Sequence, residues 1–218
     1  MADKYAAKEA AEKAARADRG KTAGTKRPRG ANPSRAPVPI AMVAGLGNPG
    51  AEYAETRHNA GFQVVDLLAQ RWGAGYWKQD AGALVTPCTI EGQAVLLAKP
   101  QSFMNTSGGP ISKLAREHRM RPEGILVVHD MLDIPAGTVK YKDGGGLDGH
   151  NGLRSIADKL KTRGFKRVEV GIGRPPGRME PADFVLRTLK GKFLEEFELT
   201  VADAANLVEQ KLKRQGQA

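Results

Sequence analysis

Residues 45–61 read GLGNPGAEYAETRHNAG and follow an apolar run at residues 40–44. The apolar run predicts a buried strand. Beyond the quoted loop, apolar residues recur at helical spacing: Phe62, Val65, Leu68, Ala69 and Trp72. Open α/β sheets place their functional sites in loops of this kind, after the carboxyl end of a strand. The loop holds Asn48, His58 and Asn59 without an evident structural reason, so we expect an active-site loop with His58 as its titratable group.

The glycines of this loop support a competing interpretation. Gly45, Gly47 and Gly50 follow a strand with the spacing of the dinucleotide-binding fingerprint. Pro49 and a polar run delay the helix, however, and the acid about 20 residues on, Asp66, falls inside the helix rather than after a second strand. A dinucleotide site is therefore the weaker alternative.

The composition describes one globular domain with a basic extension. The chain has 218 residues, 40% hydrophobic and 27% charged, and its one cysteine excludes an internal disulfide framework. No apolar run approaches the roughly 18 residues of a spanning helix, so no membrane association is expected. We expect residues 40–218 to form a single catalytic domain and residues 1–39 to be a basic, disordered N-terminal extension.

The net charge of +10 points to an anionic partner, and nucleic acid is the leading candidate. The excess is uneven along the chain. Residues 1–39 hold ten Lys/Arg and four Asp/Glu, which gives +6, and the rest holds 24 and 20, which gives +4. Much of the basicity therefore belongs to the extension, and the domain itself is only moderately basic.

Strand-like and helix-like segments alternate through the domain, which predicts an α/β layered fold. A hairpin-like middle, with a turn at residues 91–92, argues for a mixed sheet. After the first helix, the expected strands are residues 75–80, 83–90, 94–98, 125–128, 138–142 and 167–172. Three further helices are expected. Ser107 is expected to cap the first, which carries Ile111, Leu114, Ala115 and His118 on one face. Asn151 is expected to cap the second, and the third is a long final helix over residues 197–212.

Four polar clusters follow strands or open helices in this scheme: residues 48–59, 99–107, 129–135 and 144–152. Histidine, aspartate and asparagine dominate them, without a serine or cysteine nucleophile motif. A histidine supported by a carboxylate suits general-base activation of water. Asparagine amides suit recognition of a peptide group and support of a developing oxyanion. The clusters therefore predict hydrolysis of an activated carbonyl, such as an ester.

Other sites are less well supported. His58, Asp130 and His150 could together ligate a metal, but no tight ligand spacing supports such a site, so none is expected. The glycine run at residues 144–146 lacks the Gly-Lys-Ser/Thr that follows in a phosphate-binding P-loop. No cofactor is expected.

Five motifs in order closely resemble the bacterial-type peptidyl-tRNA hydrolase family: GLGNPGAEYAETRHNAG, KPQSFMNTSG, HDMLDIPAG, GGGLDGHNGLRS and FKRVEVGIGRP. The resemblance runs from about Ile40 to the final helix. It implies a single three-layer α/β/α domain with a mixed twisted sheet. It also implies a monomeric, metal-independent, cytoplasmic enzyme that cleaves the ester between a peptide and tRNA, which frees the tRNA for reuse in translation.

The resemblance also implies roles for individual residues. His58 is similar to the catalytic base, Asp130 to the acid that supports it, and Asn48 to the residue that separates N-blocked from free aminoacyl-tRNA. The remaining matches are substrate-contact and pocket positions, with two lysines where basic residues would meet tRNA phosphate: Tyr53, Phe103, Met104, Asn105, His150, Asn151, Lys140 and Lys142.

Two positions depart from the family pattern. Asp148 stands where a small residue is usual, and Glu169 stands where a basic residue is common, so we expect a weaker tRNA-facing charge. A non-catalytic RNA-binding relative is the contrasting alternative. The intact set of Asn48, His58, Asn105, Asp130 and Asn151 speaks against it.

Overall fold

A mixed seven-stranded sheet forms the centre of the protein, in a computed structural model that describes residues 37–217. The strand order is β2-β3-β4-β1-β5-β7-β6. The strands are β1 (Met42–Gly45), β2 (Lys78–Asp80), β3 (Ala83–Ile90), β4 (Gln93–Pro100), β5 (Ile125–Met131), β6 (Val139–Asp143) and β7 (Lys166–Gly171). The expected α/β fold with a mixed sheet is confirmed.

The four middle strands are parallel, and the strands at the edges are antiparallel. β1 pairs in parallel with β4 and β5, and β5 pairs in parallel with β7. The β2-β3-β4 hairpins form one edge, and β6 pairs antiparallel with β7 at the other. Every residue of β1 and β5 is buried, as the short apolar runs in the sequence indicate for strands covered on both faces.

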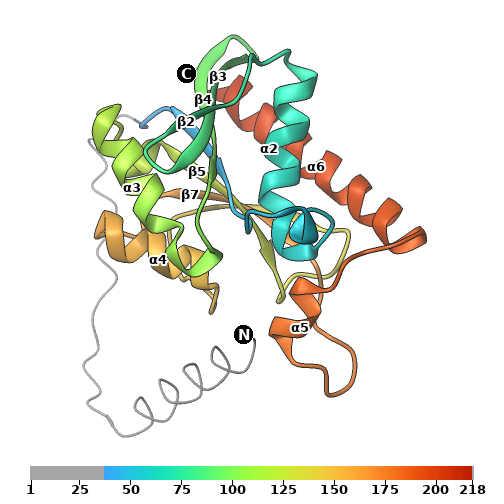
Figure 1. Cartoon of the computed structure of the whole chain (residues 1–218). Helices are drawn as coiled ribbons and strands as arrows, with labels where there is room; N and C mark the ends of the chain where they lie inside the picture. The colour runs from blue at the N-terminus through green and yellow to red at the C-terminus, as the bar shows by residue number, and fades with distance from the viewer. Residues whose placement is uncertain (1–36, 218) are drawn as a thin grey trace, which may run out of the picture. The chain divides into compact units, whose positions relative to one another are not determined.

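Helices cover both faces of the sheet, which gives three layers (Figure 1). Helices α2 (Ala60–Arg71) and α6 (Lys192–Gln215) pack with the core that contains Val43, whereas α3 (Gly108–Glu117) and α4 (Asn151–Leu160) pack with the core that contains Met42 and Ala44. Successive residues of β1 thus serve opposite layers. A short helix, α5 (Pro181–Leu186), and four 3₁₀ turns complete the fold: η1 (Ala51–Tyr53), η2 (Arg57–Asn59), η3 (Met104–Thr106) and η4 (Pro122–Gly124).

Two expectations, the N-terminal extension and the lack of a membrane-spanning helix, can be compared with the structure only over residues 37–217. Residues 1–36 of the predicted extension lie outside them. Within them, the Val38 carbonyl accepts a hydrogen bond of 3.1 Å from Lys166 Nζ, so contacts with the domain begin before Ile40. Among residues 37–217, no helix combines the length and apolar character needed to cross a bilayer.

Several local predictions were wrong in detail. The strand expected over residues 75–80 is confined to β2. His118, expected on the same helix face as Ile111, Leu114 and Ala115, is exposed and pairs with Asp80. The cap of α4 is His150 and not Asn151, because His150 Nδ1 accepts a hydrogen bond of 3.4 Å from the Leu153 N–H. Ser107 precedes α3 but does not cap it with its side chain, since its hydroxyl donates to the Met104 carbonyl. Helix α5 was not anticipated.

Two glycines allow the start of α2 to lie directly against the end of β1. A Cβ added to Gly45 would lie 2.2 Å from the Gly61 carbonyl oxygen, and one added to Gly61 would lie 2.2 Å from Leu46 N and 2.3 Å from Val128 O. These neighbours are backbone atoms, which cannot turn aside as a side chain can. The close approach also carries a hydrogen bond of 3.2 Å from Phe62 N to Leu46 O. It fixes the turn η2, which bears His58, next to the ends of β1 and β5.

Substitution of Gly61 by alanine tests this close packing. Gly61→Ala is expected to lower the free energy of unfolding by about 1–3 kcal/mol or more, because the new methyl group overlaps backbone that cannot move away. Gly109→Ala is the matched control, since Gly109 lies in α3 with nothing within 4 Å of the added Cβ. It is expected to be neutral or to stabilise by up to about 1 kcal/mol. Denaturant unfolding measures both, and equal stabilities would contradict the packing argument.

Candidate active site

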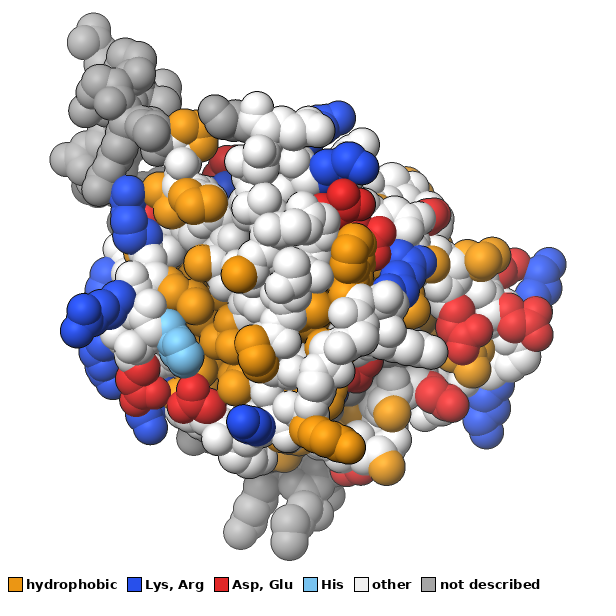
Figure 2. All heavy atoms as spheres, turned by 90° about the horizontal axis from the view of Figure 1, so that it is seen from above, with side chains coloured by type: hydrophobic (Ala, Val, Ile, Leu, Met, Phe, Trp, Pro, Cys, Tyr) orange, Lys and Arg blue, Asp and Glu red, His pale blue; other side chains and the backbone are white. Residues whose placement is uncertain are grey.

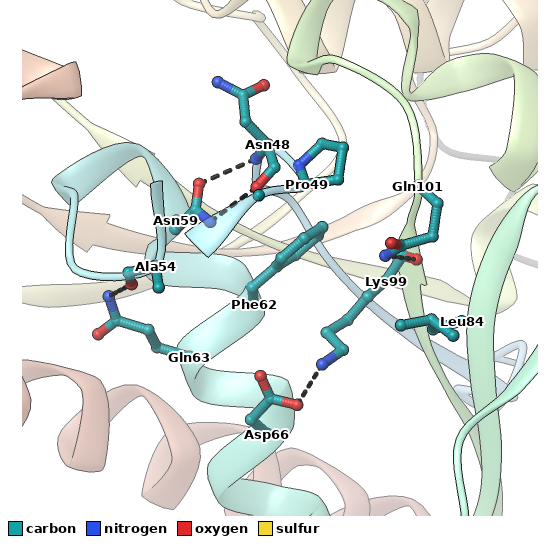
Figure 3. Close-up of a pocket in the computed structure, with 11 residues that line it drawn as sticks. Asn48, Pro49, Ala54, Asn59, Phe62, Gln63, Asp66, Leu84, Lys99 and Gln101 are labelled. Atoms are coloured by element: carbon teal, nitrogen blue, oxygen red, sulfur yellow. Dashed lines mark hydrogen bonds and ion pairs between the residues drawn. The ribbon is translucent and has the colours of Figure 1, made fainter. Parts of the chain in front are cut away.

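The loop after β1 is held in shape by Asn59. Its side chain bonds to the backbone of Asn48 in both directions: Asn48 N donates to Asn59 Oδ1 at 2.9 Å, and Asn59 Nδ2 donates to Asn48 O at 3.0 Å (Figure 3). Asn59 is only 3% exposed. The sequence singled it out as polar without an evident structural reason, and the structure supplies one.

In the side-chain amide of Asn48, the oxygen accepts a hydrogen bond and the nitrogen is left without a partner among residues 37–217. Its Oδ1 accepts a hydrogen bond of 2.8 Å from the Met104 N–H of η3. Within residues 37–217, Nδ2 has no hydrogen-bond partner, and in Figure 3 the amide points away from Pro49 and the loop backbone. Asn48 therefore joins two of the predicted clusters and keeps an N–H donor for another molecule.

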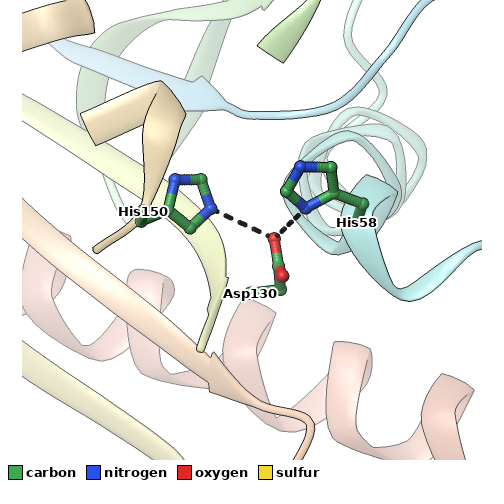
Figure 4. Close-up of side chains that lie close together, drawn as sticks. All are labelled: His58, Asp130 and His150. Atoms are coloured by element: carbon green, nitrogen blue, oxygen red, sulfur yellow. Dashed lines mark hydrogen bonds and ion pairs between the residues drawn. The ribbon is translucent and has the colours of Figure 1, made fainter. Parts of the chain in front are cut away.

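Three side chains from three separate segments meet at a single carboxylate oxygen (Figure 4). Asp130, near the end of β5, is 2% exposed. Its Oδ1 lies 2.9 Å from His58 Nδ1 and 3.2 Å from His150 Nε2. The convergence of His58, Asp130 and His150 was expected from the strand ends on which their clusters lie.

The buried carboxylate of Asp130 and the imidazole of His58 shift each other's pKa values. Burial alone would lower the pKa of His58, but the charge and the hydrogen bond of Asp130 outweigh it, and the pKa is raised above 6.5. Burial alone would raise the pKa of Asp130, but the charge of His58 and the hydrogen bonds of both histidines hold it far below its usual range. Asp130 therefore stays ionised at neutral pH.

The hydrogen bonds also determine which nitrogen of each neutral histidine carries the proton. His150 Nδ1 accepts from the Leu153 N–H, so its proton resides on Nε2 and points at Asp130. An ionised carboxylate only accepts, so neutral His58 donates through Nδ1. The lone pair of His58 Nε2 is left available, and His58 can take a proton from a neighbouring water.

A third histidine, His129, lies behind this group and stays neutral. It is fully buried, and its ring is edge-on to His150 with a centroid separation of 4.8 Å. Burial and the neighbouring His150 lower its pKa to about 3, and its Nδ1 donates to the Asp130 carbonyl at 2.7 Å. It lies in β5, directly before Asp130.

Another glycine allows η3 to approach α4. A Cβ on Gly152 would lie 2.6 Å from Met104 Sδ, 2.8 Å from Leu46 Cδ1 and 3.1 Å from His150 Cε1. Met104, which the sequence placed in the pocket, is buried against this glycine. Its backbone N–H holds Asn48, so one residue connects the Asn48 side of the site with the His150 side.

The glycine-rich loop before α4 is fixed by Arg167, which sequence reasoning did not single out. Arg167 is fully buried, and its guanidinium donates to the carbonyls of Gly144 and Gly146. In the sequence, Arg167 is one of three charged residues of this strand, with Lys166 and Glu169, and nothing local distinguishes it from them. The same loop brings Asp148 Oδ2 to 2.8 Å from Lys142 Nζ on β6.

The other predicted substrate positions lie at or near the surface, and within residues 37–217 no side-chain hydrogen bond joins them to the histidine group. Tyr53 in η1 is half-buried, and Phe103 is 53% exposed. Asn105 in η3 is exposed, and Asn151 begins α4 and accepts from Arg154 Nη1 at 3.4 Å. Lys140 and Lys142 lie on edge strand β6 and line a separate hollow with Asp148 and Glu169.

A metal ion is the other species that the three grouped side chains could hold. One ligand atom each from His58, Asp130 and His150 lies within 4.8 Å of the others. A metal would have to displace the proton that the Leu153 N–H fixes on His150 Nε2, and His58 already shares its Nδ1 proton with the same oxygen. The chemistry of this arrangement favours proton transfer, and the absence of a metal from the reaction stays a prediction.

A cavity of about 220 Å³ opens beside Asn48, on the α2 side of the loop (Figure 3). Phe62 and Leu84 give it apolar walls, and Lys99 pairs with Asp66 in it at 2.5 Å. Asp66 is thus engaged by Lys99, as well as lying inside α2, which further disfavours the role that a dinucleotide site would require of it.

Comparisons with known proteins agree on one family. The family model described as Peptidyl-tRNA hydrolase matches residues 42–218. The chain is 52% identical over 168 residues to the peptidyl-tRNA hydrolase of Frankia alni, covering 77% of this chain and 85% of that protein. It is 49% identical over 174 residues to that of Nocardia farcinica, covering 79% and 90%.

A solved structure from the same family has the same fold. The crystal structure of peptidyl-tRNA hydrolase from Acinetobacter baumannii superposes with a TM-score of 0.75 at 36% identity, covering 82% of this chain and 91% of that one. The resemblance noted in the sequence is confirmed, and the chain belongs to the peptidyl-tRNA hydrolase family of enzymes.

Proposed function

We propose that this enzyme hydrolyses the ester that joins a peptide to the terminal ribose of tRNA, with His58 as general base. The observation that carries the proposal is the 2.9 Å contact between His58 Nδ1 and Asp130 Oδ1, which leaves Nε2 free to accept a proton. Water that loses its proton to Nε2 attacks the ester carbonyl. Asp130 stabilises the imidazolium that forms, because its charge raises the pKa of His58.

In this proposal, Asn48 recognises the substrate. Its Nδ2 is a donor without a partner among the described residues, on the loop that Asn59 ties to the turn bearing His58, so it can bond to a carbonyl of the peptide. An N-blocked substrate offers that carbonyl, whereas an aminoacyl-tRNA with a free amine does not. His150 orients Asp130 through Nε2, and the exposed side chains of Phe103, Asn105 and Asn151 are available to contact the acceptor end of tRNA.

One face of the protein carries side chains of both signs of charge. On the face drawn in Figure 2, lysine and arginine side chains lie mostly around the rim with acidic side chains among them. Lys140 and Lys142, two positions apart on β6, are the residues that we assign to phosphate. We further expect a cytoplasmic monomer that uses no metal or other cofactor.

Replacement of His58 tests the proposed base. His58→Ala is expected to lower kcat by about 10²–10⁴-fold, because water must then react without general-base assistance. His118→Ala is the matched control and is expected to keep full activity, since His118 is exposed and pairs with Asp80 on another part of the surface. The measurement is release of deacylated tRNA from an N-acetylated aminoacyl-tRNA, with circular dichroism to confirm folding.

The same assay has two outcomes that contradict the proposal. Near-normal turnover by a folded His58→Ala protein would remove His58 from the chemistry. A wild-type protein that binds tRNA but releases nothing from the N-acetylated substrate would instead indicate a non-catalytic RNA-binding member of the family.

Asn48→Asp tests recognition separately from structure. The new carboxylate retains an acceptor for the Met104 N–H but loses the Nδ2 donor and gains a charge that favours an ammonium group. Hydrolysis of N-acetylated aminoacyl-tRNA is therefore expected to fall more than hydrolysis of the free-amine substrate. The measurement is the ratio of kcat/KM for the two substrates, in the wild type, Asn48→Asp and Asn48→Ala. Equal losses on both substrates would exclude a discriminating role.

A further inference from the structure

The two residues that depart from the family pattern both face Lys142. Its Nζ lies 2.8 Å from Asp148 Oδ2 and 3.8 Å from Glu169 Oε1. The sequence placed Lys142 among the groups that would meet tRNA phosphate. In the structure, carboxylates already surround its ammonium group.

We propose that Asp148 occupies the place of a substrate phosphate on Lys142, and that tRNA exchanges with it on binding. This inference rests on the proposed function and identifies Asp148 as a residue that sets affinity for tRNA. A carboxylate and a phosphate both offer anionic oxygens to an ammonium group, and the two anions repel each other, so the Asp148 carboxylate disfavours a phosphate at the same position on Lys142.

The pair is weak enough to be exchanged. The side chains of Lys142 and Asp148 are each 36% exposed, and ion pairs in such positions contribute little because water competes for both charges. The two lysines, Asp148 and Glu169 also line a hollow of about 370 Å³, which has room for a phosphate group.

Glu169 behaves differently from Asp148. It is 5% exposed, lies across from Lys140 in the β6–β7 ladder, and its Oε1 has no hydrogen-bond partner within residues 37–217. Because this side chain is nearly covered, it stays beside Lys142 when the pair with Asp148 is exchanged. The exchange therefore concerns Asp148 alone.

The turn that carries Asp148 allows it to move without disturbing the site. Asp148 and Gly149 both have positive φ, 46° and 80°, and His150 N donates to Leu147 O at 2.9 Å across them. Asp-Gly is a favoured pair for a tight turn of this kind. Arg167 holds the loop upstream through the Gly144 and Gly146 carbonyls, so release of the Asp148 side chain leaves the backbone that leads to His150 in place.

The turn also offers a simpler explanation: Asp148 is there only because the turn accepts aspartate. Asp148→Asn separates the two, because asparagine suits the same turn but has no charge to compete with phosphate. Asp143→Asn, at the end of β6, removes the same charge from a neighbouring exposed residue and is the matched control.

The experiment measures KM and kcat for N-acetylated aminoacyl-tRNA against salt concentration, and the dissociation constant for deacylated tRNA. Asp148→Asn is expected to lower KM and the dissociation constant by about two- to fivefold at unchanged kcat. The slope of log affinity against log salt should steepen by about one, because one more cation meets phosphate. Asp143→Asn should change these quantities less and leave the slope as it is.

A double variant decides whether Lys142 mediates the effect. Lys142→Ala should weaken binding, and Lys142→Ala/Asp148→Asn should bind no better than Lys142→Ala alone. The inference is overturned if Asp148→Asn leaves affinity and slope unchanged, or if it strengthens binding equally without Lys142. Absence of turnover by the wild type would refute the proposed function, and the dissociation constants would still test the exchange.

Discussion

The close contact between Gly45 and Gly61 is the constraint on which the site depends. It lets the first turn of α2 lie against the end of β1 with backbone atoms in direct contact. The preceding turn, η2, is consequently held beside the end of β5, where Asp130 lies. A larger residue at either glycine would push α2 outward, and the hydrogen bond between His58 and Asp130 would lengthen.

Asp130 then sets the protonation of His58, through its hydrogen bond to Nδ1 and its negative charge. A carboxylate that is 2% exposed is stable as an anion only because two imidazoles donate to the same oxygen. This arrangement fixes the tautomers of His58 and His150 and leaves one nitrogen lone pair, on His58 Nε2, open for a proton. Burial of His129 in neutral form adds no competing charge behind the site. Asp130 and His150 thus serve one purpose, the orientation of a single base.

The sequence predicted the features that follow from local pattern. The apolar run at residues 125–128 and the helical spacing after Gly61 gave a central strand and α2, and the polar clusters at strand ends led to His58 and Asp130. Features that depend on tertiary contacts were missed. No local sequence pattern distinguishes His150 from Asn151 as the cap of α4. None indicates that Arg167 donates to the carbonyls of a loop more than 20 residues earlier in the chain. The contact of Lys142 with Asp148 likewise depends on how the loop before α4 lies against β6.

The most direct test of the account compares two pKa values. The pKa of His58, from NMR titration of the free enzyme, should equal the pKa of the acidic limb of kcat/KM against pH. Because His58 must be neutral to act, activity should rise with pH through that value, which lies above 6.5 in the wild type. In Asp130→Asn the raising charge is gone, so both pKa values should move together to lower pH while the plateau rate falls. A kinetic pKa that differs from that of His58, or that stays fixed in Asp130→Asn, would contradict the assignment of His58 as the base.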